Sequence, residues 1–369
     1  MKKLYSLLLA FSLVLPMLPV LAQTMGAYVN YRDRLIVFDD GVFKEIEYQK
    51  PMAVKVGGNY VAYLDNTDNL KVYQNGQVKT LEGSRNIDPT VTNYFLGYKV
   101  AGVLKVYHDG KLTPLCYNTG SHIVQDSIVA WFDEVNMTLN IYEHGESIVL
   151  EDALALDPIN NFKGGDNILA YITNVERKFK IYYDGDVWII NDFVPKDMDY
   201  KVGRDLVAYQ DVSDKTFNAF YKGEIYDIED FMPKRFEVGD EILAYVDVAD
   251  NLKVFEGGKI YTAAEFAPDK IFVQDSLVMF EQQGFLWAFK DGETHQVTRY
   301  IPKQWRASWG TIAFLDQNGF IRVFQDGEEN MLSRDERVNE FDVNRNVIVF
   351  KVGVNTNKVW YKGRIHQNE

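Results

Sequence analysis

Short runs of apolar residues end ten times along this chain in an aromatic residue that is followed three positions later by glycine. The ten aromatic residues are Phe38, Tyr73, Tyr107, Tyr142, Tyr182, Phe220, Phe255, Phe289, Phe324 and Trp360. Successive members of this series are 34 to 40 residues apart. A fixed period of this length indicates one supersecondary unit that is repeated ten times.

The unit around Phe255 shows the elements that each repeat predicts. Residues 236–238 and 242–247 are apolar-rich runs separated by a Gly-Asp turn, and residues 252–255 and 259–261 are two further runs around a Gly-Gly turn. Strand-forming residues bounded by Gly, Asp and Asn at this spacing are typical of short antiparallel strands. We therefore expect four strands in each unit and no competing helix.

The turn between the third and fourth expected strands has the clearest chemistry. The residue before the glycine is Asp, Asn or Gly in seven of the ten units. A two-residue type I′ turn requires positive φ at both central positions, which these residues tolerate best. We therefore predict a tight hairpin in every unit, with the aromatic ring at its mouth covering the neighbouring unit.

The second strand of each unit has its own marker, a small or apolar residue followed by an aromatic residue. Examples are Ala62-Tyr63, Ala130-Trp131 and Ala244-Tyr245. Small side chains beside large ones allow facing sheets to interdigitate without voids. The two markers agree on ten units, and four-stranded units of this size arranged radially are the blades of a β-propeller. The fold class predicted is therefore all-β.

A resemblance to a known family lies in the turn between the first two strands. Residues 238–245 (Val-Gly-Asp-Glu-Ile-Leu-Ala-Tyr) and 273–280 are similar to the blade signature of the TolB-type, WD40-like (PD40-like) propeller family. In that family a Ser-Pro-Asp-Gly turn precedes a strand that ends in Ala-Phe; here the Ser-Pro pair is missing and the turn is shorter. The resemblance covers nearly all of the repeat region and implies the blade topology, but no particular function.

Three arrangements of ten units are open. One large ring is favoured because nothing interrupts the period, although ten blades exceed the usual four to eight. Two rings of five would place the break in the longer intervals between Tyr142 and Phe220, and an open β-solenoid fits hairpin-linked strands least well. The first unit begins at Ala27, which leaves no room for a leading strand. The ring could therefore close by pairing its first and last strands, or contain one three-stranded blade.

The N-terminal segment predicts export. Lys2 and Lys3 precede an almost wholly apolar run from Leu4 to Leu21, and the run ends at Ala22. This pattern is typical of a cleaved secretory signal peptide at residues 1–22. An uncleaved membrane anchor is disfavoured because the run is short and contains two prolines. We expect residues 23–369 to form a single propeller domain that is periplasmic or secreted and does not span a membrane.

Charge and cysteine content restrict the partners and the sources of stability. The chain has 39 basic and 53 acidic side chains, a net charge of −14, and no basic run. Counterion release requires clustered Lys and Arg, so nucleic acid is not an expected partner. Cys116 is the only cysteine, which excludes an internal disulfide and leaves stability to packing.

No motif predicts catalysis or a resident cofactor. The five histidines form no metal pair, and no hydrolase or phosphate-binding motif occurs. Five aspartates lie two positions after the second-strand aromatic residue, namely Asp65, Asp133, Asp211, Asp247 and Asp316. Equivalent places in different blades would give a rim of carboxylates that could bind calcium or a cationic partner. An Asx turn that caps the following loop is the favoured alternative. We predict no catalytic, cofactor-binding or metal-binding residue.

Three of the tryptophans that lie outside both repeat markers are the candidate binding residues. They are Trp188, Trp305 and Trp309, and Arg306 accompanies Trp305. Trp and Arg are enriched in binding hot spots, so Trp188, Trp305, Arg306 and Trp309 form a candidate patch. Packing within a divergent blade is the alternative explanation for all of them.

These patterns favour a non-enzymatic scaffold over an enzyme. The expected protein is an exported propeller that binds another protein of the cell envelope, for example as an accessory subunit or plug of a secretion channel such as a type 9 translocon. The alternative is a carbohydrate-binding or carbohydrate-active propeller, which predicts an axial pocket with two or three carboxylates and an exposed tryptophan. A calcium-stabilised scaffold is the third hypothesis.

Overall fold

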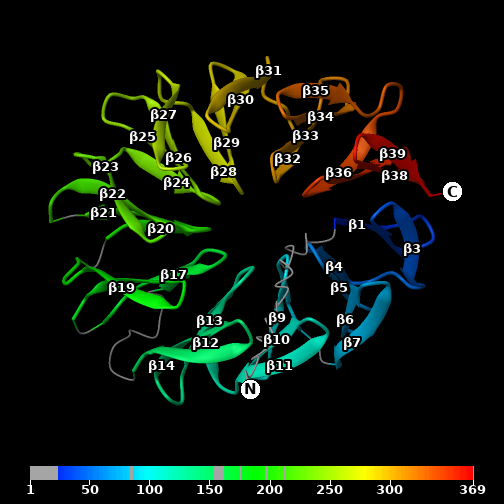
Figure 1. The fold of residues 1–369 in the computed structure, drawn as a ribbon. Helices are drawn as coiled ribbons and strands as arrows, with labels where there is room; N and C mark the ends of the chain where they lie inside the picture. Colours follow the sequence, from blue (N-terminus) through cyan, green and yellow to red (C-terminus); the bar gives the residue numbers. More distant parts are fainter. Residues whose placement is uncertain are drawn as a thin grey trace, which may run out of the picture.

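The computed structural model describes residues 24–83, 86–152, 162–174, 176–195, 198–211 and 213–368, and the expected signal peptide lies outside these ranges. Figure 1 shows small antiparallel sheets that follow one another around a common axis in the order of the sequence. The last blade lies beside the first, so the sheets form one closed ring of ten blades. The prediction of a single ring is confirmed, and the division into two five-bladed rings is wrong.

The described residues form 39 strands and no helix. Blade 1 has the strands β1 (Met25–Val29), β2 (Leu35–Asp39) and β3 (Val42–Glu47). Blades 2 to 4 have β4 (Ala53–Val56), β5 (Val61–Leu64), β6 (Asn69–Gln74), β7 (Gln77–Gly83), β8 (Thr90–Val91), β9 (Leu96–Val100), β10 (Val103–His108), β11 (Lys111–Cys116), β12 (Thr119–Val124), β13 (Val129–Asp133), β14 (Thr138–Glu143) and β15 (Glu146–Glu151). Blades 5 to 7 have β16 (Phe162–Gly164), β17 (Ile168–Ile172), β18 (Phe179–Tyr183), β19 (Asp186–Asn191), β20 (Tyr200–Gly203), β21 (Leu206–Asp211), β22 (Thr216–Tyr221), β23 (Glu224–Glu229), β24 (Arg235–Val238), β25 (Ile242–Val246), β26 (Leu252–Glu256) and β27 (Lys259–Ala264). Blades 8 to 10 have β28 (Lys270–Gln274), β29 (Leu277–Gln282), β30 (Phe285–Lys290), β31 (Glu293–Thr298), β32 (Trp305–Ser308), β33 (Thr311–Leu315), β34 (Ile321–Gln325), β35 (Glu328–Met331), β36 (Val338–Asn344), β37 (Val347–Val352), β38 (Thr356–Tyr361) and β39 (Arg364–Gln367).

The strands of each blade pair in chain order, and each is antiparallel to the next, as in β24-β25-β26-β27. In Figure 1 the first strand of a four-stranded blade lies nearest the axis. This order places the turns between strands one and two, and between strands three and four, at one end of the ring, which we call the turn face. The turns between strands two and three and the connections between blades lie at the opposite end, the loop face.

The predicted hairpins between the third and fourth strands are confirmed in all ten blades. The first central residue has φ between 43° and 58°, and the following glycine has φ between 75° and 91°. His144, Lys222 and Lys362 adopt the same conformation as the Asp, Asn and Gly residues of the other turns. Positive φ at both positions gives the backbone twist that matches the flanking strands.

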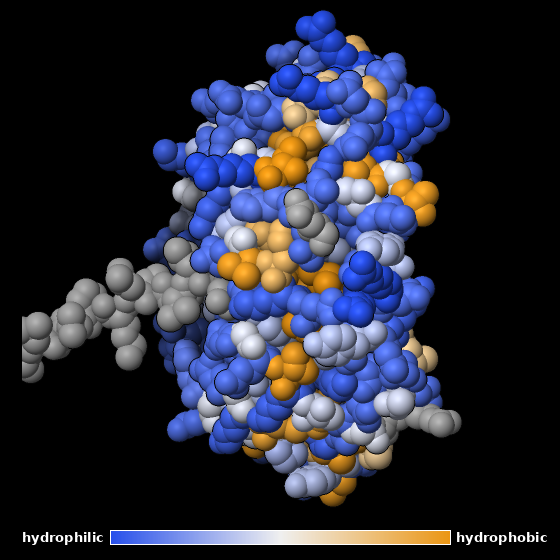
Figure 2. Space-filling view, turned by 90° about the vertical axis from the view of Figure 1, so that its right-hand side faces the viewer, coloured by the Kyte–Doolittle hydropathy of each residue, from blue (hydrophilic) through white to orange (hydrophobic). Residues whose placement is uncertain are grey.

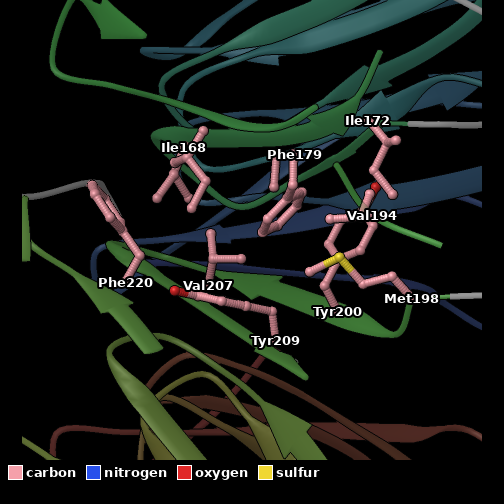
Figure 3. Packing of buried hydrophobic residues seen from close by; sticks show 11 residues of the cluster. Ile168, Ile172, Phe179, Val194, Met198, Tyr200, Val207, Tyr209 and Phe220 are labelled. Carbon is pink, nitrogen blue, oxygen red and sulfur yellow. The ribbon is translucent and has the colours of Figure 1, made fainter. Parts of the chain in front are cut away.

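Packing between blades buries both sequence markers. Figure 3 shows Ile168 and Phe179 of blade 5 facing Val207, Tyr209 and Phe220 of blade 6. The rings of Phe179 and Tyr209 have centroids 5.4 Å apart. Similar clusters recur between the other blades, so each blade covers its apolar face with its neighbour, as expected for a repeat architecture.

The ends of the inner strands approach each other very closely. A Cβ atom on Gly203, at the end of β20, would lie 1.8 Å from the carbonyl oxygen of Gly239, at the same place in the next blade. A Cβ atom on Gly165 would lie 1.9 Å from the carbonyl oxygen of Gly203. Glycine is therefore required here because the neighbouring backbone occupies the space of a side chain.

Polar contacts also join successive blades. The hydroxyl group of Tyr245 in β25 donates a hydrogen bond of 2.9 Å to Oε1 of Glu229, which ends β23 of the preceding blade. Nζ of Lys253 lies 2.6 Å from the same carboxylate and 3.2 Å from Asp247 of its own blade. Lys71 contacts Glu47 and Asp65 in the same way between blades 1 and 2.

Blade 1 has three strands within the described residues and lacks an inner strand. Its β1 contains Ala27-Tyr28, the marker of a second strand, and pairs only with β2. Blade 1 closes the ring through side-chain packing, because the ring of Phe38 lies 5.5 Å from that of Tyr361 in blade 10. Of the two predicted modes of closure, the three-stranded blade is therefore confirmed.

The rim of the ring is mainly hydrophilic with separate apolar patches. Figure 2 views the rim from the right-hand side of Figure 1 and shows orange patches that follow one another between hydrophilic side chains. Exposed apolar residues of the outer strands include Val42, Val78 and Ile365. Single exposed apolar residues of this kind are normal for a soluble surface. Within the described residues, no helix has the length and apolar character needed to cross a membrane.

Candidate functional site

The turn between the first and second strands places one residue of each four-stranded blade near the axis, on the turn face. The equivalent residues are Gly58, Asn93, Asp126, Asp166, Arg204, Asp240, Asp275, Trp309 and Arg345. All but Gly58 have side chains that can bind polar or charged groups, and together these eight form what we call the axial cluster. Their positions follow from the repeat, because equivalent turns of a ring converge on its axis.

Arg204 is at the centre of the axial cluster. Its Nη2 atom lies 3.5 Å from Oδ2 of Asp126 and 3.5 Å from Oδ2 of Asp240, and it also bonds to Asp166. These carboxylates come from blades 4, 5 and 7, so one guanidinium group of blade 6 pairs with three other blades. Asp126 also accepts a hydrogen bond of 2.6 Å from the backbone N–H of Asn93.

Two guanidinium groups lie over the ring of Trp309. Cζ of Arg345 is 4.4 Å from the ring centroid and Cζ of Arg204 is 5.3 Å from it. The backbone N–H of Trp309 donates a hydrogen bond of 2.6 Å to Oδ2 of Asp275, and Trp309 has a φ of 47°. Positive φ is an uncommon conformation for so bulky a residue. The hydrogen bond and the cation–π contacts hold the indole at the axis.

The carboxylates of the axial cluster outnumber its cations. Burial, followed by the negative charge of Asp166, raises the pKa of Asp240 to about 7, despite the opposing attraction of Arg204. Burial and the charge of Asp126 also raise the pKa of Asp166. Burial lowers the pKa of Arg345. The cluster therefore changes its charge near neutral pH, and shifted carboxyl pKa values in a concave site are typical of functional positions.

A cavity of about 540 Å3 opens beside the axial cluster and extends over blade 7. Its wall includes Arg204, Asp240, Asp275 and Trp309 of the cluster. Tyr221, Glu256 and Tyr261 belong to the outer part of the wall. The cavity thus combines carboxylates with aromatic rings, and 38% of the Trp309 surface remains exposed. Among the described residues, no group of three or more His, Cys, Asp or Glu is arranged to hold a metal ion.

The five repeated aspartates lie on the loop face and cap turns. Oδ1 of Asp247 accepts hydrogen bonds from the backbone N–H groups of Ala249, at 2.9 Å, and Asn251, at 2.8 Å. Equivalent bonds are made by Asp65, Asp133, Asp211 and Asp316. Burial acts to raise the pKa of Asp65, but hydrogen bonds from Asn69 and Thr67 outweigh it and lower that pKa. These carboxylates therefore form the predicted Asx turns.

The connections between blades present large aromatic side chains on the loop face. Phe193, Phe231 and Phe266 each lie two positions after the outer strand of their blade (β19, β23 and β27) and are 66%, 63% and 66% exposed. We call these three residues the phenylalanine series. Each is the first residue of a Phe-x-Pro sequence, and Tyr300-Ile301-Pro302 is the equivalent between blades 8 and 9. Repeated exposure of so large an apolar side chain is unusual on a soluble surface.

The loops that hold the phenylalanine series are anchored by the residues that follow. Val194 is buried between blades, beside Tyr200 and Met198 in Figure 3, and its N–H donates to the carbonyl oxygen of Arg177 at 2.9 Å. Pro233 and Pro268 are buried two positions before the inner strands β24 and β28 begin. Proline is suited to that position because it offers no N–H for strand pairing. The exposed rings therefore stand on fixed backbone.

The four residues proposed from the sequence lie in two different blades. Trp188 is in β19 at the rim, where its ring lies 5.7 Å from that of Phe220. Trp305 begins β32 and packs against Phe272 at 5.0 Å, with Arg306 exposed beside it. Trp309 follows the other end of β32 and joins the axial cluster. The structure thus brings Trp309 into a site and does not place Trp188 near it; a shared binding patch stays a prediction.

Two sets of residues were not found by sequence reasoning. The axial cluster occupies the same place in eight of the ten repeats, the third residue of the eight that end in the second-strand aromatic residue, but its residue types differ from blade to blade. The phenylalanine series was visible as a recurring Phe-x-Pro sequence. An alignment of the ten repeats on their two aromatic markers shows both the axial cluster and the phenylalanine series as recurring positions.

The comparison with protein families agrees with the blade count. The sequence model of the family described as "10-bladed beta propeller domain" matches residues 20–366. The chain belongs to the ten-bladed β-propeller family. A comparison with curated proteins returns no match.

Solved structures similar to this ten-bladed propeller share little sequence with it. The computationally designed protein Ika8 has 13% identity and a TM-score of 0.38, with 92% of this chain and 99% of that chain covered. The CRINKLY WD40 ectodomain of the Arabidopsis thaliana receptor kinase ACR4 has 9% identity and a TM-score of 0.31, with 66% and 94% covered. Prp20p from Saccharomyces cerevisiae has 9% identity and a TM-score of 0.33, with 64% and 81% covered. At these scores the likeness carries no information about function.

Proposed function

We propose that this ten-bladed propeller is an exported, non-enzymatic scaffold that docks another protein of the cell envelope through its loop face. The observation that carries the proposal is the phenylalanine series, three exposed rings at equivalent places of consecutive blades. Aromatic residues on a rigid surface are typical anchors of protein interfaces. A protein-binding role is also consistent with the propeller fold.

The cellular setting belongs to the same proposal. The basic start at Lys2 and Lys3 and the apolar run to Leu21 support secretion with cleavage after Ala22, into the periplasm or beyond. The net charge of −14 disfavours nucleic acid as the partner. N-terminal sequencing of the mature protein after cell fractionation tests this part.

A plug or accessory subunit of a secretion channel is the specific form of the proposal. The axial cluster supports this plug role. Arg204 pairs with Asp126 and Asp240 and contacts Trp309 across the ring. Polar side chains therefore cross the axis at the turn face. A rigid disc whose centre is crossed in this way is suited to cover an opening. Its loop face would then provide the contacts with the channel protein.

The test is affinity capture from native envelopes at the natural expression level. We expect one stoichiometric envelope protein to be captured by the wild type and lost from a variant with Phe193, Phe231 and Phe266 replaced by Ser. The matched control replaces Val42, Ile225 and Ile260, which are exposed on the outer strands β3, β23 and β27, by Ser. Recovery of the wild type without a stoichiometric partner, or equal loss in both variants, would contradict the proposal.

A carbohydrate-binding role is the second candidate, because the cavity of the turn face has the features expected for it. The carboxylates of Asp240 and Asp275 and the partly exposed Trp309 line the cavity together. Two guanidinium groups already lie over the indole ring, however, which leaves less of the ring for a sugar to stack on. The test compares glycan-array binding of the wild type with that of a Trp309→Ala variant. Specific glycan binding by the wild type that is lost in the variant would support this role.

A further inference from the structure

Two adjoining hollows lie on either side of Tyr300, between blades 8 and 9. One has a volume of about 530 Å3 and includes Arg299, Arg322 and Glu329 in its wall. The other has a volume of about 570 Å3 and includes Lys303 and Arg337. Tyr300 and the turn at residues 316–318 belong to both walls, so the hollows form one groove that is divided by the tyrosine. We call it the Tyr300 groove.

The Tyr300 groove is basic on a strongly acidic protein. Its two carboxylates, Asp316 and Glu329, are both paired with Arg322, and Nε of Arg322 lies 3.1 Å from Oδ2 of Asp316. Arg299, Lys303 and Arg337 are exposed and form no ion pair with any described residue. Four cations therefore face two carboxylates in the groove, an excess of two positive charges, whereas the whole chain has a net charge of −14. An excess of one sign in a concave surface attracts a partner of the opposite sign.

The position of the cations restricts the shape of the occupant. Arg299 lines one side of Tyr300, and Lys303 and Arg337 line the other. Cations on both sides of Tyr300 suit an extended chain that passes over the tyrosine and carries several carboxylates. Tyr300 belongs to the same repeat position as the phenylalanine series but is partly buried, and it lines both hollows between the charges.

We propose that the Tyr300 groove binds an extended, Asp- and Glu-rich segment of the partner protein. The inference rests on the proposed scaffold function and identifies the chemistry of one part of its partner. The carboxylates of the segment pair with Arg299 on one side and with Lys303 and Arg337 on the other, and an apolar residue of the segment lies on the ring of Tyr300. The adjoining phenylalanine series extends the contact surface around the loop face.

The test measures binding of a fluorescein-labelled peptide, Glu-Asp-Phe-Glu-Asp-Leu-Glu-Glu, by fluorescence anisotropy at low ionic strength. A peptide with Gln and Asn in place of Glu and Asp is the uncharged probe. The test variant replaces Arg299, Lys303 and Arg337 by Gln. Its matched control replaces Lys111, Lys259 and Arg364 by Gln, three cations that begin the outer strands β11, β27 and β39. All six side chains are exposed, so neither set disturbs the core.

We expect the acidic peptide to bind the wild type and the control variant equally, and the test variant about tenfold more weakly. The uncharged peptide should bind none of them, and added salt should weaken the wild-type complex. Absence of acidic-peptide binding, or an equal loss in both variants, would overturn the proposal. So would binding of phosphatidylglycerol vesicles or inorganic phosphate through the same three cations without binding of the peptide. The capture experiment with the phenylalanine variant is independent: if it succeeds while the peptide fails, the groove proposal falls and the scaffold proposal stands.

Discussion

Asn344 and Met25 are 319 positions apart in the sequence, and Nδ2 of Asn344 donates a hydrogen bond of 2.9 Å to the carbonyl oxygen of Met25. The same amide group donates to the carbonyl oxygen of Gly57 at 3.0 Å. Asn344 ends the inner strand of blade 10, whereas Met25 and Gly57 belong to blades 1 and 2. One side chain therefore bridges the place where blade 1, among the described residues, has no inner strand.

Replacement of Asn344 by Ala should weaken this closure. Two backbone carbonyl groups would lose their partner in a partly buried place, so we expect the free energy of unfolding to fall by about 1–3 kcal/mol. Urea denaturation followed by tryptophan fluorescence measures the change. Asn330→Ala, on the exposed outer strand β35, is the control and should change stability little. Equal stability of the two variants would show that Asn344 does not close the ring.

The close approach of the inner strands predicts a large cost for Gly203→Ala. The new Cβ atom would lie 1.8 Å from the carbonyl oxygen of Gly239, so the two blades would have to separate. We expect a loss of about 3 kcal/mol or a failure to fold, measured by thermal unfolding and soluble yield. The control is Gly145→Ala, where the new Cβ atom meets open space but φ is 87°. It measures the cost of the positive φ alone, without a steric clash, and should lower the free energy of unfolding by only about 1–2 kcal/mol. A smaller effect at Gly203 than at Gly145 would contradict the packing described.

Asp240 predicts a stability change near neutral pH. Burial and then Asp166 raise its pKa to about 7 in the folded protein, whereas an aspartate of an unfolded chain has a pKa of about 4. The folded state therefore binds this proton more tightly, and the stabilisation is complete below about pH 4 and is lost as the pH rises through about 7. Asn cannot lose a proton, so an Asp240→Asn variant should gain in melting temperature relative to the wild type between pH 5 and pH 8.

The control for this measurement is Asp326→Asn, at an exposed hairpin turn where Asn also accepts positive φ. Its melting temperature should stay at a constant difference from the wild type over the same pH range. If the melting temperature of Asp240→Asn also differed from that of the wild type by a constant amount, Asp240 would be ionised over the whole of this pH range.

The Asx turns predict that stability is independent of calcium. Oδ1 of Asp247 is already occupied by two backbone N–H groups, so a chelator should leave the melting temperature unchanged. Asp247→Ala removes these bonds and should cost about 1–2 kcal/mol. Asp247→Asn keeps an acceptor oxygen and should cost less than half as much, although it weakens the ion pair with Lys253. A melting temperature that falls with EDTA would restore the hypothesis of a calcium-stabilised scaffold.

The fold could be predicted from local chemistry that every blade shares. An Asp-Gly pair between two apolar runs, such as Asp291-Gly292, favours a tight hairpin turn, and Ala244-Tyr245 marks a strand buried between two sheets. Each of these patterns depends on only a few neighbouring residues, so the sequence alone predicts the turn and the buried strand. The three-stranded form of blade 1 in the part of the chain that the structure describes could also be predicted, because the first unit begins at Ala27.

The candidate sites could not be predicted in the same way, because they depend on closure of the ring. Arg204 and Trp309 are 105 positions apart and meet only because their turns converge on one axis. Trp305 and Trp309 are close in sequence, yet they lie at opposite ends of β32. A side chain that belongs to the core in most blades and to a site in one blade cannot be recognised from its residue type alone.

Photocrosslinking in living cells tests the docking surface most directly. A p-benzoylphenylalanine residue placed at Phe231 on the loop face, or at Ile225 on the outer strand β23 of the same blade, replaces an exposed apolar side chain in each case. We predict one discrete crosslinked envelope protein from position 231, repeated at positions 193 and 266, and none from position 225. Crosslinks to the same protein from position 225 alone, or no crosslink from any position of the phenylalanine series, would contradict docking through the loop face.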